Sequence, residues 1–256
     1  FFPVLAFGLG IGNLFIGLPI SYNAFSLRSF YHGNFFDLFN MFGMLCALAS
    51  LFMCLMHGTA HLNRRTEGAL RFVFMRLHRM FAIVFLLLFT LGWLMLALRV
   101  NGYDLAGAML TAGTQSPIHS EVHRGIGLWL VGFHEHPWKW LGPILAYVGV
   151  VMAVLTARIG RGGLSFWCSA IGVAGTVLTA IFALFPFIIP SSVNPSESLT
   201  IWNATSAQYT LMGMFYISVV MLVIIFAYKL WGFSAVWRRK KTLSIADVQQ
   251  HEHTFY

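Results

Sequence analysis

Six long apolar stretches dominate this sequence and limit what the chain can fold into. A helix that crosses the hydrocarbon core of a bilayer needs about 20 mostly apolar residues. The stretches are too long for barrel strands and show no polar–apolar alternation, which favours helices. We predict an all-α, polytopic transmembrane bundle that forms one domain over residues 1–256. Its helices are expected near residues 2–20, 38–58, 80–98, 140–157, 164–190 and 207–228.

The composition excludes an ordinary soluble protein. Charged residues make up 9% of the chain and hydrophobic residues 58%, whereas soluble domains carry about 25% charged residues. The net charge of +8 would suggest nucleic acid as a partner for a soluble protein. Here the basic residues flank the apolar stretches, so we expect no nucleic-acid partner. Cys46, Cys54 and Cys168 lie within apolar runs and indicate neither a disulfide framework nor a metal site.

The basic residues gather in alternate connections. The positive-inside rule places such connections in the cytoplasm, so we predict a bacterial inner-membrane protein with a cytoplasmic tail at residues 232–256. The chain opens at Phe1 inside an apolar stretch, and we expect it to begin partway through a longer polypeptide. The basic residues are Arg64, Arg65, Arg71, Arg76 and Arg79, then Arg158 and Arg161, then Arg238, Arg239, Lys240 and Lys241.

The histidines are the obvious candidates for metal or haem ligands. His57 and His61 are four residues apart and share one face of a helix, and His78 is the nearest candidate on another helix. We favour hydrogen-bonded interfacial histidines, because no second pair of ligands is evident. A zinc site is conceivable among the outer-loop histidines, but solvent exposure is the more common state. These are His32, His119, His123, His134 and His136, and the tail adds His251 and His253.

We therefore predict no catalytic, cofactor-binding or metal-binding residue in this chain. Ionisable residues at depth mark proton and ion paths, but only Asp37 and Lys229 approach the ends of spans. The sequence has no phosphate-binding glycine loop and no nucleophile elbow. Of the two longer outer connections, 99–139 contains an apolar patch, Gly125–Phe133, that we expect to lie flat on the membrane surface.

Three segments carry a more specific signal than the general membrane character of the sequence. They read SFYHGNFFDL at residues 29–38, FPFIIPSS at 185–192 and SLTIWNATSAQYTL at 198–211. Together they resemble subunit II of the cytochrome bd-type quinol oxidases, including the cyanide-insensitive branch. The resemblance extends over essentially the whole chain, and the order and spacing of the segments also match.

The resemblance implies a function and a partner. In this family subunit I carries two b-type haems, haem d and the quinol-oxidising loop, and the complex reduces O2 to water. Subunit II binds no haem, packs against subunit I and can hold a quinone structurally, and a small accessory subunit can join the complex. Members have nine transmembrane helices, of which this chain would supply the fourth to the ninth.

The family's proton-path acids lie in its first helices, so no family catalytic residue maps onto this chain. The sequence also departs from the family at Asn203, where some members have Asp, and at Met41, where many have Pro. These changes leave the branch of the family open.

Two other functions remain open from the sequence. A multi-pass transporter of an apolar substrate would suit the composition, although transporters usually have broken helices and polar groups at the midplane. A stand-alone b-type cytochrome would use His57, His61 and His78 as ligands. A haem spectrum of the purified chain separates that alternative from the oxidase subunit.

Overall fold

The computed structural model describes residues 1–23, 26, 28–105 and 121–237, with side chains up to residue 234. Within these residues, five helices are long and apolar enough to cross a bilayer, and a sixth, α1, is shorter. The predicted all-α polytopic membrane bundle is confirmed. The helices are α1 (Phe2–Ile16), α2 (Met41–Arg65), α3 (Gly68–Leu98), α4 (Val131–Glu135), α5 (Leu141–Arg158), α6 (Gly162–Leu184) and α7 (Gln208–Trp237).

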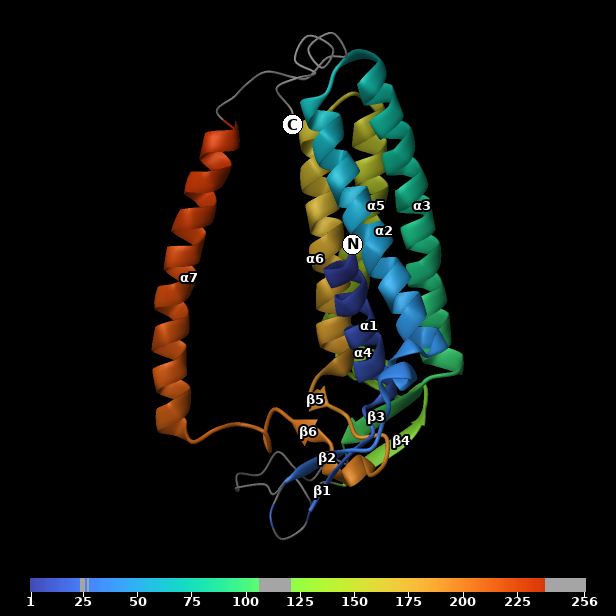
Figure 1. The fold of residues 1–256 in the computed structure, drawn as a ribbon. Coiled ribbons are helices and arrows are strands. Elements are labelled where there is room, and N and C mark those ends of the chain that lie inside the picture. Colours follow the sequence, from blue (N-terminus) through green and yellow to red (C-terminus); the bar gives the residue numbers. More distant parts are fainter. Residues whose placement is uncertain (24–25, 27, 106–120, 238–256) are drawn as a thin grey trace.

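The core of the molecule is a bundle of α2, α3, α5 and α6, with α1 packed against α2 (Figure 1). Helix α7 stands apart from this bundle in Figure 1. All its side chains from Gln208 to Trp231 are exposed. The described part of the chain therefore consists of one packed bundle and one helix that runs beside it.

Close contact between α5 and α6 depends on residues without bulky side chains. Gly149 faces Gly172, and a Cβ added to Gly149 would lie 2.5 Å from the Gly172 nitrogen. Gly12 of α1 faces Gly43 of α2 in the same way, with 2.7 Å between such a Cβ and the Gly43 Cα. Apolar helices in lipid gain no hydrophobic energy from meeting one another, so close backbone approach and van der Waals packing hold them together.

The two ends of the bundle differ in structure. One end carries three antiparallel hairpins and several short helices, and we call it the hairpin end (Figure 1). Its strands are β1 (Ile20–Tyr22) with β2 (Ser29–Tyr31), β3 (Asn101–Leu105) with β4 (Val122–Ile126), and β5 (Phe187–Ile189) with β6 (Leu199–Thr200). Its 3-10 helices are η1 (Phe35–Phe39), η2 (Leu128–Leu130), η3 (Pro137–Trp140) and η4 (Pro195–Glu197).

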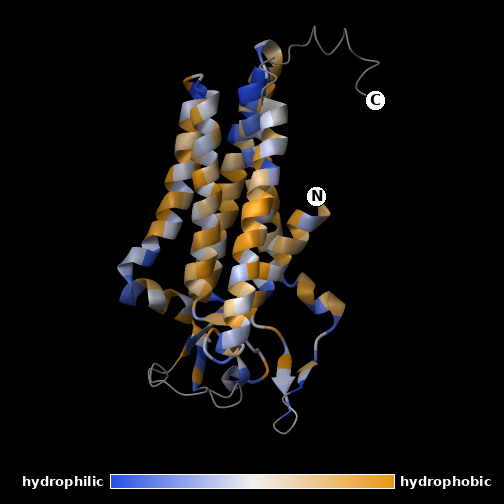
Figure 2. Ribbon diagram, turned by 90° about the vertical axis from the view of Figure 1, so that its left-hand side faces the viewer, coloured by the Kyte–Doolittle hydropathy of each residue, from blue (hydrophilic) through white to orange (hydrophobic). Residues whose placement is uncertain are grey.

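The opposite end, which we call the arginine end, holds the tight α2–α3 and α5–α6 connections. Figure 2 shows hydrophilic residues gathered there, above helices that are mostly hydrophobic. Its basic residues are Arg64, Arg65, Arg71, Arg76, Arg79, Arg158 and Arg161. The Arg71 side chain ties the two connections together, because it donates hydrogen bonds to Asn63 Oδ1 at 3.3 Å and to the Gly160 carbonyl at 2.5 Å.

Several helix ends differ from the expected ones. Helix α3 begins at Gly68 rather than near residue 80, since its first turns are polar and lie beyond the apolar stretch. Helix α1 ends at Ile16 rather than near residue 20, because Gly17 adopts φ 89° and turns the chain. Helix α6 ends at Leu184, before Pro186, and α7 continues to Trp237.

Candidate functional site

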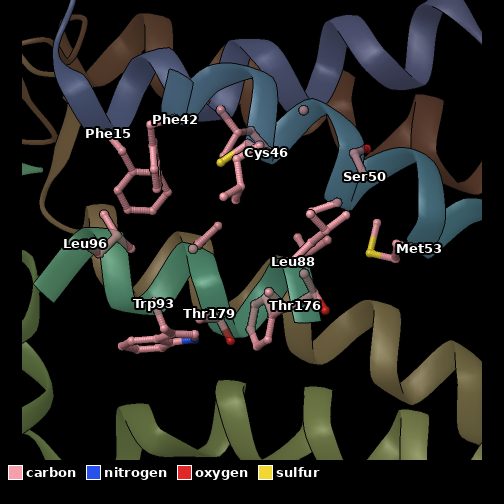
Figure 3. A pocket seen from close by; sticks show the side chains of 18 of the residues that line it. Phe15, Phe42, Cys46, Ser50, Met53, Leu88, Trp93, Leu96, Thr176 and Thr179 are labelled. Carbon is pink, nitrogen blue, oxygen red and sulfur yellow. The ribbon is translucent and has the colours of Figure 1, made fainter. Parts of the chain in front are cut away.

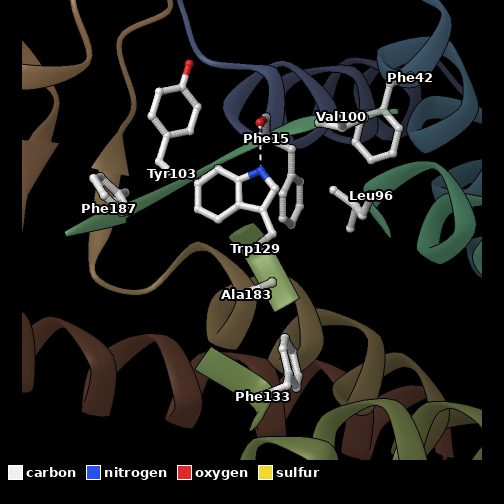
Figure 4. Close-up of a cluster of buried hydrophobic side chains, with 9 residues drawn as sticks. All are labelled: Phe15, Phe42, Leu96, Val100, Tyr103, Trp129, Phe133, Ala183 and Phe187. Atoms are coloured by element: carbon white, nitrogen blue, oxygen red, sulfur yellow. Dashed lines mark hydrogen bonds between the residues drawn. The ribbon is translucent and has the colours of Figure 1, made fainter. Parts of the chain in front are cut away.

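An aromatic cluster fills the space where the bundle meets the hairpin end (Figure 4). Phe15 of α1 meets the Trp129 ring edge to face, with 5.6 Å between centroids, and Trp129 also meets Phe187 at 5.9 Å. Trp129 and Phe133 are only 2% and 1% exposed. The segment Gly125–Phe133 therefore points its aromatic residues into the core. The expectation that it lies flat on the membrane surface is wrong, because its aromatic side chains pack against the rest of this chain.

Two aromatic side chains from this cluster donate hydrogen bonds to free carbonyls at the C-terminal end of α1. The last four carbonyls of a helix have no partner within it. Trp129 Nε1 donates to the Phe15 carbonyl at 3.0 Å (Figure 4), and the Tyr103 hydroxyl donates to the Ile16 carbonyl at 3.1 Å. Burial raises the pKa of the Tyr103 phenol above its ordinary value, although nearby Arg124 opposes the shift. The phenol therefore keeps its proton and can donate.

The two segments FPFIIPSS and SLTIWNATS meet in a polar network under the helices. The Ser191 amide donates to Ser198 Oγ at 3.0 Å, and Ser191 Oγ donates to the Ile20 carbonyl at 2.6 Å. Buried Glu197 accepts from the Tyr22 amide at 2.7 Å. Burial, together with the Glu197 carboxylate, raises the pKa of the Tyr22 phenol. This network joins the β1–β2 and β5–β6 hairpins and gives these residues a structural role.

Asn203 belongs to the same segment. Its Oδ1 accepts from the Thr200 amide at 2.7 Å, and its Nδ2 donates to the Ser198 carbonyl at 3.0 Å. An amide side chain both accepts and donates, whereas an ionised carboxylate only accepts. The Asn203 side chain can therefore use both its oxygen and its nitrogen to hold this turn.

An apolar cavity of about 120 Å³ lies within the bundle (Figure 3). Helices α1, α2, α3 and α6 line it. The hydroxyls of Thr176 and Thr179 in its wall already donate to carbonyls of their own helix, at 2.9 and 2.7 Å. The cavity is therefore suited to a flexible hydrocarbon chain. Its labelled lining residues in Figure 3 are Phe15, Phe42, Cys46, Ser50, Met53, Leu88, Trp93, Leu96, Thr176 and Thr179.

The histidines near the arginine end have separate partners. His57 Nδ1 lies 2.9 Å from Ser169 Oγ, and that hydroxyl donates to the Phe166 carbonyl at 2.7 Å. The serine oxygen thus accepts a hydrogen bond from His57 Nδ1. His61 packs its ring against Phe166, with 5.5 Å between centroids, and His78 donates from Nδ1 to the Met56 carbonyl at 3.0 Å. Among the described residues, no three His, Cys, Asp or Glu side chains converge as metal ligands would.

The remaining candidate residues lie at the surface. His32 hydrogen-bonds Ser21 Oγ at 2.7 Å across the β1–β2 hairpin. Asp37 is exposed and accepts from the Asn34 amide at 2.7 Å, so it caps η1. Lys229 is exposed on α7. His123, His134 and His136 are exposed at the hairpin end, whereas His119, His251 and His253 lie outside the described residues.

Sequence reasoning missed a buried cation at the hairpin end. Lys139 of η3 is only 5% exposed, and its ammonium lies 5.6 Å from the centre of the Phe185 ring. It lines a pocket of about 510 Å³ together with Tyr103, Asp104 and Trp202. The WKW sequence around it reads as an interfacial anchor, so no local signal indicates that this lysine is covered by a distant helix end.

The chain is similar to known oxidase subunits along its whole length. A family model described as cytochrome bd terminal oxidase subunit II matches residues 1–236. Over 256 residues the chain is 35% identical to the cytochrome bd-I ubiquinol oxidase subunit 2 of Escherichia coli, and 34% identical to the probable cytochrome oxidase subunit 2 of Haemophilus influenzae. It is 22% identical over 237 residues to the cytochrome bd ubiquinol oxidase subunit 2 of Bacillus subtilis.

All of this chain aligns with the first two of these relatives, but it spans only 66% of their length. For the Bacillus subtilis protein the aligned shares are 93% of this chain and 60% of the relative. The helical bundle, its apolar spans and the two joined loop segments all agree with the match to residues 1–236. This multi-pass membrane chain belongs to the cytochrome bd terminal oxidase subunit II family.

Proposed function

We propose that the chain acts within the non-haem subunit II of a cytochrome bd-type quinol oxidase. The observation that carries this proposal is the family match over residues 1–236, on a chain whose bundle is built from apolar spans. In this role the chain supports quinol oxidation and the reduction of O2 to water without supplying catalytic residues. Its main contribution is the packed bundle itself, which gives a haem-bearing partner a rigid surface.

The partner in this proposal is subunit I, which would hold haems b and d. A small accessory subunit and surrounding lipid complete the assembly. The relatives are named as subunit 2 of an oxidase, which supports a heteromeric complex. The side chains of α7 from Gln208 to Trp231 are exposed, and such an apolar surface suits contact with lipid or another membrane helix.

We place the arginine end in the cytoplasm and the hairpin end on the periplasmic side of a bacterial inner membrane. The support is the positive-inside rule, because seven arginines lie at the α2–α3 and α5–α6 connections. On this orientation α7, which runs from the hairpin end, ends on the cytoplasmic side, and residues 238–256 of the predicted cytoplasmic tail lie outside the described residues.

We infer that a structural quinone would enter the apolar cavity of this chain through its tail. The cavity of about 120 Å³ between α1, α2, α3 and α6 is apolar, and the threonine hydroxyls in its wall are already engaged. It therefore suits an isoprenoid chain, whereas quinone carbonyls would find few donors there. Phe7, Ile11 and Leu88 would contact such a chain. A quinone bound this way stabilises the bundle rather than exchanging electrons.

The proposed function is tested by complementation. The full-length protein that contains this chain is coexpressed with subunit I in a strain that lacks bd-type oxidases. We expect the two subunits to copurify, with b-type and d-type haem bands and quinol-dependent O2 consumption. A protein that folds in the membrane, fails to bind subunit I and restores no O2 consumption would contradict the proposal.

A further inference from the structure

A pocket of about 230 Å³ opens at the arginine end between α3 and α5. Its polar wall consists of the side chains of Arg76 and Arg79 from α3 and Arg158 from the last turn of α5, with His78 beside them. The rest of the lining is mostly apolar, from Phe72, Met75, Val154 and Ala157. The pocket thus combines three positive charges with an apolar wall.

Among the residues that the structure describes, the three arginines have no counter-charge of their own. Within the described residues, none of Arg76, Arg79 and Arg158 makes an ion pair or a side-chain hydrogen bond. Glu67, the acid closest in sequence to Arg76 and Arg79, sits exposed at the N-cap of α3. Three guanidinium groups that line one pocket repel one another, so an anion placed between them relieves this repulsion and gains charge-assisted hydrogen bonds.

His78 supplies the second observation. It lines the same pocket, it is 0% exposed, and its Nε2 has no hydrogen-bond partner among the described residues. Its Nδ1 must carry a proton to donate to the Met56 carbonyl, so Nε2 of the neutral ring is an acceptor. The Ala153 carbonyl also lies near the ring, but a carbonyl is an acceptor and cannot donate a proton to Nε2. A buried acceptor without a donor is unfavourable, and a small shift of the ring toward the pocket would let a ligand hydroxyl or a bound water satisfy it.

The depth of the pocket matches the membrane surface. The apolar part of α3, residues 80–98, is about 28 Å long at about 1.5 Å per residue, which nearly fills a hydrocarbon core of about 30 Å. Arg76 and Arg79 therefore lie at the level of the lipid headgroups. Phe72, at 71% exposure, extends the apolar wall outward.

We propose that this pocket binds a phosphate-bearing anion at the membrane surface. Arg76, Arg79 and Arg158 hold the phosphate, and a hydroxyl of the same molecule or a bridging water donates to His78 Nε2. The apolar wall favours an anionic phospholipid, such as one with a phosphoglycerol headgroup, over soluble phosphate. The proposal does not depend on the oxidase function, since it rests on this pocket alone.

The test uses the purified full-length protein with any subunit that copurifies, stripped of lipid by detergent exchange. Dioleoylphosphatidylglycerol, dioleoylphosphatidylcholine or inorganic phosphate is added, and retained molecules are counted by native mass spectrometry. The test variant is Arg76→Gln with Arg158→Gln. The control is Arg99→Gln with Arg161→Gln, which removes the same charge from exposed sites outside the pocket.

We expect one dioleoylphosphatidylglycerol molecule to resist removal from the parent protein and from the control variant. Its apparent affinity should fall roughly tenfold in the test variant, because two charge-assisted contacts are lost. Competition by inorganic phosphate at equal concentration would identify soluble phosphate as the ligand instead. Retention that is equal in both variants, or equal for the glycerol and choline lipids, would overturn the proposal. Circular dichroism of each variant checks that the helices remain folded.

Discussion

At the scale of single residues, Trp129 joins the hairpin end to α1. It packs edge to face on Phe15 and donates to the Phe15 carbonyl at 3.0 Å. We expect Trp129→Phe to destabilise the bundle by about 1–3 kcal/mol, because it leaves a buried carbonyl unpaired. Thermal unfolding of the full-length protein in detergent measures this loss. The control is Trp138→Phe, since Trp138 is 61% exposed and should change stability little.

His57 and His61 give a second residue-scale prediction. His57 already donates to Ser169 Oγ, and His61 packs on Phe166, so we expect neither imidazole to bind haem. Replacement of both by Gln in the assembled oxidase should leave the b-type bands of the reduced-minus-oxidised spectrum unchanged. Loss of one b-type band while the subunits remain associated would show that one of the two histidines is a ligand.

Local sequence explains some residue choices and fails for others. Met41 stands at the first position of α2, next to Asn40, whose side chain accepts from the Gly43 amide at 2.7 Å. The Asn40 cap therefore marks the start of α2 locally in the sequence. The buried state of Lys139, by contrast, depends on Phe185, which is far away in the sequence.

At the scale of helices, the α5–α6 pair is the most tightly packed. A Cβ at position 149 would press on the backbone of Gly172 at 2.5 Å, so Gly149→Ala forces two helices apart. We expect a loss of about 1–3 kcal/mol in unfolding free energy, as for other overpacked cores. Gly163→Ala is the matched control, because nothing lies within 4 Å of its added methyl group. Equal melting temperatures for the two variants would contradict this account of the packing.

Hydropathy predicts the existence of the helices better than their ends. The apolar stretch at 80–98 identifies α3, but not its first turns, where Arg71, Arg76 and Arg79 lie beyond the hydrocarbon. A helix continues into the headgroup region wherever its backbone hydrogen bonds remain satisfied. Hydropathy does not detect these polar turns. The hairpin end shows the same limit, since strands of two to five residues are too short to display alternation.

At the scale of the whole molecule, the two ends of the bundle allow a test of orientation. Cys46, Cys54 and Cys168 are first replaced by Ala, and single cysteines are then placed at Glu67, in the α2–α3 connection, or at Ile126 of β4. Both positions are exposed. A membrane-impermeant maleimide added to intact cells should label Ile126→Cys and leave Glu67→Cys unlabelled until the cells are broken. The reverse pattern would show that the arginine end faces outward.

The separation of α7 from the bundle has a consequence for cooperativity. Its backbone hydrogen bonds close within the helix, so α7 can persist in a bilayer without support from the bundle. The aromatic cluster, the glycine contacts and the Arg71 ties all lie outside α7. Heat that melts these contacts would leave α7 helical, so the chain should lose its structure in two separate transitions rather than one. The backbone amides of α7 would then exchange with solvent deuterium at rates set by the lipid and not by the stability of the bundle.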